Sequence, residues 1–174
     1  MEDLSFPIGK YLPQPFSEEE LKERLIAILF LPNQLENSIL NLDEHQIETP
    51  SRPGGWTVKQ LVHHVADSHM NAFIRFKLGL TEENPTIKPY KQDAWANLND
   101  SKIVPTNVSI TLLHALHARW GALLSGVASV ELERTVFHPE QNKEITLWHL
   151  LGLYAWHSKH HVAHITALRE RMKW

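Results

Sequence analysis

Four of the nine residues from Trp156 to His164 are histidines, and their spacing is suited to binding a metal ion. In a helix, residues four apart lie one above the other, so a His-x-x-x-His pair can direct two imidazoles at one cation. Two such pairs are possible here, His157 with His161 and His160 with His164. The direction of the apolar face of the helix must decide between them.

Apolar residues in this segment recur at intervals of three and four and define one stripe, because a helix has about 3.6 residues per turn. They are Leu147, Leu150, Leu151, Tyr154, Ile165 and Leu168. His161 lies within this stripe and His157 at its edge, whereas His164 and especially His160 are rotated toward the far side. We therefore predict that His157 and His161 face the interior and bind the ion.

A catalytic zinc-type centre usually has three protein ligands and one open position, so a third ligand is needed. His64 borders a second helical stripe, beside Val65, whereas His63 is rotated from it by about 100° and His69 lies near its edge. His64 is the predicted third ligand. Asp67, three residues further on, is a candidate to accept the free ring N–H of a metal-bound histidine. An exposed helix charge is an equally good interpretation of Asp67.

Composition restricts the class of protein. The 174 residues are 43% hydrophobic and 21% charged, which is typical of a soluble globular protein, and we expect a single domain over residues 1–174. No apolar run approaches the roughly 20 residues that span a bilayer. No basic and apolar leader opens the chain, so a cytoplasmic location is expected.

The net charge of −3 offers no basic patch for nucleic acid. Because cysteine is absent, any thiol chemistry requires a small-molecule thiol.

Four helices account for the apolar periodicity. An extended, proline-containing arm over residues 1–16 precedes them, with Phe6, Tyr11 and Phe16 expected to hold it against the body. The predicted helices begin after the capping residues Ser17 and Thr57, at about Ser109, and after Thr146. They end near residues 42, 79, 127 and 171, and the first is expected to kink near Pro32. The segment 49–55 reads as a loop, and residues 138–143 as a turn.

Residues 81–106 contain three prolines and little periodicity, which predicts a long loop between helices two and three. No segment has a convincing period-two pattern, so no strand is expected. The predicted fold is an all-α, up-and-down four-helix bundle, a fold whose core commonly holds metal ligands from facing helices.

The chain also resembles a known family. His64 together with His157-x-x-x-His161 is similar to the metal triad of the DinB/YfiT-like superfamily, and further similarity covers almost the whole chain. It includes residues 6–11, 54–58, 63–71, 74–78 and 151–158. The resemblance implies an up-and-down bundle, one zinc or nickel ion per subunit on these three histidines, and a homodimer. Family members are named as metal-dependent hydrolases, and others resemble transferases or isomerases that use bacillithiol, mycothiol or glutathione.

Three functions are compatible with these observations. The first is a metal-dependent S-transferase that directs a low-molecular-weight thiol onto a small electrophile. The second is a metal-dependent hydrolase of a small amide or ester, which would need a general base. No glutamate follows either histidine of the pair, so the base would have to be Asp67 or a non-ligand histidine. The third is a non-enzymatic metal-binding stress protein. Candidate residues for a substrate pocket are Arg75, Arg119, Trp120 and Tyr154, although core or solvated positions suit them better.

Overall fold

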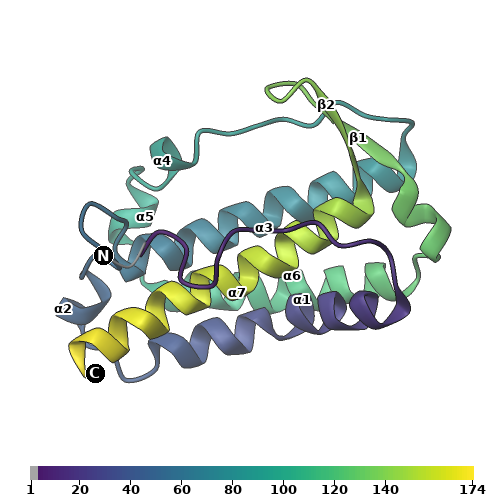
Figure 1. Cartoon of the computed structure of the whole chain (residues 1–174). Coiled ribbons are helices and arrows are strands. Elements are labelled where there is room, and N and C mark those ends of the chain that lie inside the picture. Colours follow the sequence, from purple (N-terminus) through teal and green to yellow (C-terminus); the bar gives the residue numbers. More distant parts are fainter. Residues whose placement is uncertain (1–3) are drawn as a thin grey trace.

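The computed structural model describes residues 4–174, so the first three residues of the predicted arm lie outside the described part. Four long helices form a bundle, which confirms the predicted fold class (Figure 1). They are α1 (Glu18–Ile39), α3 (Val58–Thr81), α6 (Thr106–Ser125) and α7 (Leu147–Met172). No helix within residues 4–174 combines the length and apolar character needed to cross a membrane.

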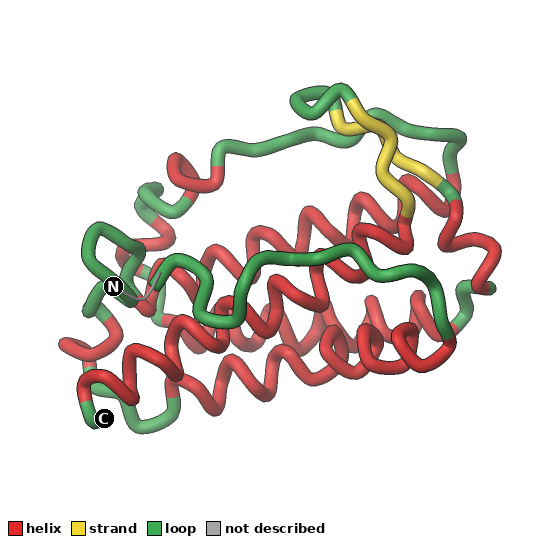
Figure 2. The backbone as a smooth tube through the Cα atoms, in the orientation of Figure 1, coloured by secondary structure: helices red, strands yellow, loops and turns green. Residues whose placement is uncertain are grey.

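The order of packing sets which helices face one another across the bundle. Both α1 and α3 pack against α6 and α7, so α1 and α3 occupy opposite corners. The segment 82–105 runs back along the bundle before α6 begins, as Figure 2 shows. As a result α6 runs in the same direction as α3, and α7 runs in the same direction as α1 (Figure 1). The four long helices therefore do not alternate in direction along the chain as in the predicted up-and-down bundle, because the long return makes α3 and α6 parallel.

The predicted capping residues begin three of the long helices. Ser17 accepts a hydrogen bond from the Glu20 backbone N–H, and Thr146 accepts one from that of His149. Thr57 and Gln60 form a reciprocal capping box at the start of α3. These bonds satisfy N–H groups that have no partner within the helix. The cap at Thr146 sets where α7 begins, and the cap at Thr57 does the same for α3.

Three short helices and an earlier start of α6 differ from the prediction. Asp43 and Gln46 form a capping box on α2 (Glu44–Ile47). The predicted loop 81–106 contains α4 (Gln92–Trp95) and α5 (Asp100–Ile103). These helices have four residues each, which is too short for a recognisable apolar period. Helix α6 follows Pro105 directly, because the proline's fixed φ is compatible with a helix start, and it ends at Ser125 rather than near residue 127.

A β-hairpin corrects the prediction that no strand is present. Strands β1 (Thr135–His138) and β2 (Lys143–Thr146) pair antiparallel around the predicted turn. Each strand turns one apolar residue inward, Val136 from β1 and Ile145 from β2. Four residues with one buried side chain give no readable alternation, which explains why the pattern was missed. The hairpin also binds the return segment, because Ile87 donates its backbone N–H to the Phe137 carbonyl.

Two hydrophobic clusters fill the bundle, one toward the hairpin and one toward the chain termini. The first contains Phe76, Trp120 and Leu151, and the second contains Leu35, Val65, Leu113 and Ile165 among others. Between them, along the same helices, lie five histidines that we call the histidine layer. Its members are His64 and His69 of α3, His117 of α6, and His157 and His161 of α7. The bundle therefore holds a polar layer between two apolar ones.

The predicted N-terminal arm lies against the body of the protein and runs along the outside of α7 (Figure 1). The aromatic rings of Phe6, Tyr11 and Phe16 contact rings of His160, Trp156 and Trp148 respectively. Two indole N–H groups of α7 donate to arm carbonyls, Trp156 to Gly9 and Trp148 to Gln14. These contacts place the start of the arm over the second half of α7, where the histidines are.

Candidate metal centre

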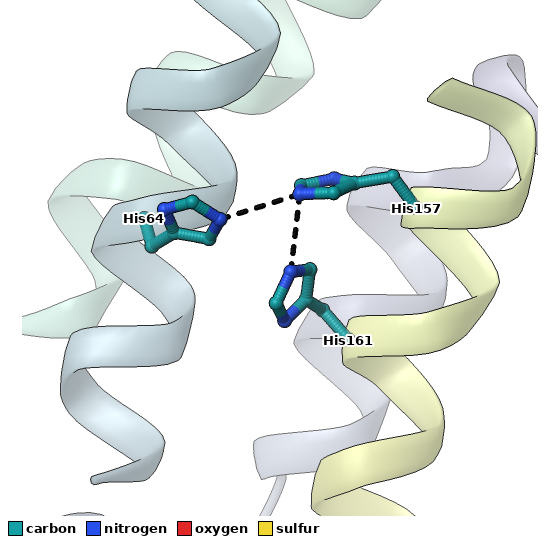
Figure 3. A group of neighbouring side chains, drawn as sticks. All are labelled: His64, His157 and His161. Carbon is teal, nitrogen blue, oxygen red and sulfur yellow. Dashed lines mark hydrogen bonds between the residues drawn. The ribbon is translucent and has the colours of Figure 1, made fainter. Parts of the chain in front are cut away.

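Three imidazoles converge between α3 and α7. The Nε2 atom of His157 lies 3.2 Å from that of His64 and 3.1 Å from that of His161. Figure 3 shows His64 pointing across from α3 toward the two histidines, one helical turn apart on α7. Among residues 4–174, these three form the one group of at least three potential ligands whose atoms lie mutually within 4.8 Å. The structure thus brings together the three residues predicted from sequence.

The geometry of the three nitrogens suits a divalent cation. Two histidine nitrogens bound tetrahedrally to zinc at about 2.0–2.1 Å are about 3.3 Å apart. The separations of His157 Nε2 from the other two nitrogens are close to that value, and all three nitrogens lie within 4.8 Å of one another. A neutral His157 Nε2 has either one proton to donate or one lone pair to offer, so it can form a good hydrogen bond to only one of the two neighbouring nitrogens. A cation that accepts all three lone pairs removes this conflict.

Burial keeps the three rings neutral, which is the form that binds metal. Burial, followed by the nearby His160 charge, lowers the pKa of His64 to about 4. The pKa values of His157 and His161 are also lowered well below the ordinary value, first by burial and then by the other histidines. The three lone pairs are therefore available at neutral pH.

A cavity of about 500 Å³ opens in front of the three nitrogens. Its walls include the rings of Phe6, Trp56 and Trp156, and the Trp56 ring lies 4.6 Å from that of His64 between centroids. Arg52 and Asp93 are its charged lining residues among those described. The arm, the loop before α3, and α4 all contribute to the lining. A small molecule that enters this cavity meets the three histidines directly.

Comparison with known proteins identifies the family. The model of the DinB superfamily matches residues 28–165, which include all three histidines. The chain belongs to the DinB superfamily. The resemblance recognised in the sequence is thereby confirmed.

Relatives of this DinB superfamily chain match it from end to end. Proteins of Bacillus cereus (strain 03BB102) and Bacillus thuringiensis subsp. konkukian, both named "Putative metal-dependent hydrolase", are each 53% identical over the full length of both chains. The solved structure of YfiT from Bacillus subtilis matches with a TM-score of 0.96 and 47% identity, covering 99% of each chain. It is described as "a probable metal-dependent hydrolase with an unusual four-helix bundle topology".

The second His-x-x-x-His pair of the DinB chain is buried, contrary to the expectation that it would point to the far side. His160 and His164 are 8% and 7% exposed, and their Nε2 atoms lie 3.2 Å apart. They line the same cavity as the three convergent histidines. The apolar stripe placed them correctly away from the bundle axis, but the N-terminal arm covers that side of α7. The Phe6 ring lies against His160.

His63 and His69 of α3 have different surroundings. His63 hydrogen-bonds to Ser109 Oγ at 2.7 Å and to the Val104 carbonyl at 3.0 Å, away from the cavity, as its rotation predicted. His69 is fully buried, and its Nε2 lies 3.2 Å from His157 Nδ1. Sequence reasoning missed this contact. The signal was present, because position 69 lies four residues after Val65 and seven before Phe76, within the apolar stripe.

Asp67 does not accept a hydrogen bond from any of the three convergent histidines among the described residues. Burial, and then the neighbouring Asp100 carboxylate, raise its pKa to about 6. The Nδ1 atom of His157 faces His69 instead, and the buried Nδ1 of His161 has no partner within residues 4–174. His69 thus occupies the place predicted for Asp67, next to the second ring nitrogen of His157. Asp67 precedes His69 by about half a helical turn, so its side chain does not lie on the interior face of α3.

The other residues predicted for a substrate pocket contact parts of the bundle and do not line the cavity. Arg75 donates to the Tyr154 hydroxyl at 2.8 Å and to the Lys88 carbonyl at 3.1 Å, tying the return segment to the bundle. Trp120 is fully buried in the first hydrophobic cluster. Arg119 lies over the Phe73 ring. The cationic residue that does line the cavity is Arg52, whose guanidinium makes no hydrogen bond or ion pair to another described residue.

Proposed function

We propose that this protein is a metal-dependent enzyme that joins a low-molecular-weight thiol to a small electrophile. The observation that carries the proposal is the convergence of three neutral histidine nitrogens on a cavity. His64, His157 and His161 would hold one divalent ion per subunit, zinc in first place and nickel as the alternative. When bound, such an ion deprotonates a coordinating thiol and keeps it as a reactive thiolate.

The residues around the cavity suit a polar thiol and an apolar electrophile. Arg52 offers a guanidinium that has no hydrogen-bond or ion-pair partner within residues 4–174 and can bind a carboxylate of a thiol such as bacillithiol or glutathione. Phe6, Trp56 and Trp156 provide apolar walls that exclude water from the reacting atoms. A transferase of this kind needs no general base once the thiol is ionised. This agrees with the absence of a carboxylate hydrogen-bonded to the three histidines among the described residues.

A turnover screen tests the proposal. Zinc-loaded protein is mixed with bacillithiol or glutathione and monochlorobimane, whose chloride is displaced as the thiolate sulfur forms a bond to carbon. We expect metal-dependent product formation that requires thiol and is lost in His64→Ala. Undiminished cleavage of ester or amide substrates by the metal-loaded protein with no thiol present would reject the transferase in favour of a hydrolase.

Hydrolysis of a small amide or ester is the second candidate. The names of the relatives support it. Among residues 4–174, Asp93 of α4 is the carboxylate that lines the cavity and is therefore the candidate general base. In the same screen, an ester panel should then give turnover that falls in Asp93→Asn. Retention of full activity in that variant would remove Asp93 from the mechanism.

A non-enzymatic, structural metal centre is the third candidate. Three ligands facing a cavity argue against it, because structural zinc sites normally close with four protein ligands. The two hydrophobic clusters do not depend on the histidines, so we expect the far-UV circular dichroism spectrum to persist after chelation. Only the mass-action stabilisation should be lost, about 4 kcal/mol when the ion is at a thousand times its Kd. Collapse of the helical spectrum on chelation would favour the structural centre.

A further inference from the structure

The histidine layer continues behind the three convergent nitrogens into the middle of the bundle. His69 lies next to His157, and the His117 ring stacks on that of His69 with centroids 5.0 Å apart. Trp120 contacts both, with ring centroids 5.7 Å from His69 and 5.6 Å from His117. All three side chains are at most 1% exposed. Buried polar atoms in such a place normally need hydrogen-bond partners.

His117, at the end of this row of buried rings that is furthest from the three convergent histidines, has a defined proton position. His117 Nδ1 lies 2.6 Å from the Ile28 carbonyl oxygen. A carbonyl oxygen only accepts, so His117 Nδ1 must carry the proton and donate it. A neutral imidazole has one proton, and His117 is neutral because burial lowers its pKa to about 4. His117 Nε2 is therefore a bare acceptor, and it has no partner among the described residues.

At the near end of the row, the proposed metal centre defines the proton position of His157. A metal-binding Nε2 of His157 offers its lone pair, so the proton of His157 resides on Nδ1. That atom lies 3.2 Å from His69 Nε2, which must accept it. A neutral His69 then carries its own proton on Nδ1. This N–H is buried and has no acceptor among the described residues.

The unpartnered atoms between the two ends complement one another. Within residues 4–174, His69 Nδ1–H and the Trp120 indole N–H are donors without acceptors, and His117 Nε2 is an acceptor without a donor. Their rings are mutual neighbours. A water molecule accepts two hydrogen bonds and donates two, so a single water has the hydrogen-bonding capacity to satisfy all three atoms. Buried waters in proteins typically make about three such bonds.

We propose that His69 is a positioning residue of the metal centre, linked through one buried water to His117 and the Ile28 carbonyl. In this relay, His69 accepts the His157 Nδ1 proton and so fixes the ring orientation and tautomer of that ligand. The buried water, shared with Trp120, fixes His69 in turn. The inference rests on the proposed metal centre and assigns a role to buried residues that do not touch the cavity.

Nitrogen-15 NMR of the zinc-loaded, full-length protein tests the proton positions. Long-range couplings distinguish a protonated from a bare ring nitrogen. We expect His69, His117 and His157 all to carry the proton on Nδ1. A proton on Nε2 of His69 would overturn the relay. A crystal structure of the zinc-loaded protein should show an ordered water bonded to His69, His117 and Trp120, and a direct bond between the two histidines would remove the water from the scheme.

Zinc affinity, measured by competition with a chromophoric chelator, tests the positioning role. His69→Phe keeps a ring but removes the acceptor, and we expect about a 10- to 100-fold loss of affinity. His69→Gln places an amide oxygen near the position of Nε2 and should recover most of it. His63→Phe is the matched control, because His63 is a buried histidine of the same helix that bonds to Ser109 rather than to a ligand. The zinc affinity of His63→Phe should differ from that of the unaltered protein by a few-fold at most.

The outcomes separate the relay from the metal centre itself. Equal affinity of His69→Phe and the unaltered protein would overturn the positioning role, as would equal weakness of His69→Phe and His69→Gln. Absence of stoichiometric zinc binding by the unaltered protein would instead reject the metal centre. If His69→Phe fails to fold by circular dichroism, the NMR proton positions of the unaltered protein still decide the question.

Discussion

At the scale of single residues, neighbouring histidines of one type have different roles because their rings face different partners. His157 and His161 face His64, whereas His160 and His164, each three residues further along α7, face the arm. His63 and His64 are adjacent, yet one bonds to α6 and the other faces the cavity. A helix rotates each residue by about 100° from the last, so adjacent positions rarely share an environment.

Ligand identity is the first residue-scale prediction. Substituting His64, His157 or His161 with alanine should each abolish stoichiometric metal binding, because two imidazoles hold a divalent ion far less well than three. His160→Ala and His164→Ala should retain a site of similar affinity, although both residues line the cavity. Elemental analysis of the purified variants measures this. Full metal in His157→Ala with none in His160→Ala would reverse the choice of pair.

Arg52 is predicted to select an anionic ligand. Its guanidinium lines the cavity and has no partner among the described residues. Burial is the main cause of the lowered pKa values of His160 and His164, and the charge of Arg52 lowers them further. A hydrogen bond to a charged group contributes about 1.5–3 kcal/mol. Arg52→Gln should therefore raise KM for a carboxylate-bearing thiol by about tenfold or more, with kcat little changed.

Steady-state kinetics with the thiol as the varied substrate measure this effect. Arg52→Lys is the control that keeps the charge and loses the planar fork, so its KM should lie between those of the other two proteins. An uncharged thiol should bind Arg52→Gln as well as it binds the unaltered protein. An unchanged KM for the carboxylate-bearing thiol would exclude Arg52 from binding.

At the scale of secondary-structure elements, two connections enclose the site that the long helices build. Helices α3 and α7 supply the three convergent histidines, while the N-terminal arm and the segment containing α4 supply parts of the cavity wall. The arm is held by indole hydrogen bonds and ring contacts along α7, and its residues are absent from both hydrophobic clusters of the described core. We therefore regard the arm as a cover rather than a part of the core.

Removal of one arm contact should expose the cavity without unfolding the bundle. Phe6→Ala deletes the ring that lies against His160, so chelators should withdraw the bound ion several-fold faster. Phe16→Ala is the matched control, because Phe16 packs on Trp148 at the other end of the arm. Metal release after addition of excess chelator measures both variants. Equal release rates from Phe6→Ala and the unaltered protein would show that the arm does not restrict access.

At the scale of the whole molecule, several neutral histidines lie buried between the two hydrophobic clusters of the bundle. Burial is the largest cause of the lowered pKa of His64, His157, His161, His69 and His117. In an unfolded chain these side chains have pKa values of about 6.5. Protons therefore bind the unfolded chain more strongly than the folded one in weak acid.

The metal-free protein should lose stability as the pH falls. For His117, the folded pKa of about 4 lies below the unfolded value of about 6.5, so between these values the unfolded state carries the extra proton. The free energy of unfolding then decreases by up to about 1.4 kcal/mol per pH unit from this group, about 3 kcal/mol in total. Urea denaturation at several pH values measures the slope, which should be shallower in His117→Gln. A stability independent of pH between about 6.5 and 4 would contradict the inferred neutral state.

The sequence by itself determined the four long helices, their caps at Ser17, Thr57 and Thr146, and the inward direction of His64, His157 and His161. Each of these follows from periodicity and capping within one helix, which are local properties. The family followed from the same motifs. Short elements escaped prediction because four residues are too few to show a period, as with α2, α4, α5 and the hairpin.

Only the tertiary structure decided which groups meet across helices. It placed the arm over His160 and His164, so that an outward rotation on α7 became a buried position in the cavity wall. It set His69 rather than Asp67 against His157, and it brought His117 of α6 behind them. Helical spacing defines the face on which a side chain lies but not the element that packs against that face. That partner depends on how the long return segment directs α6 and on where the arm crosses α7.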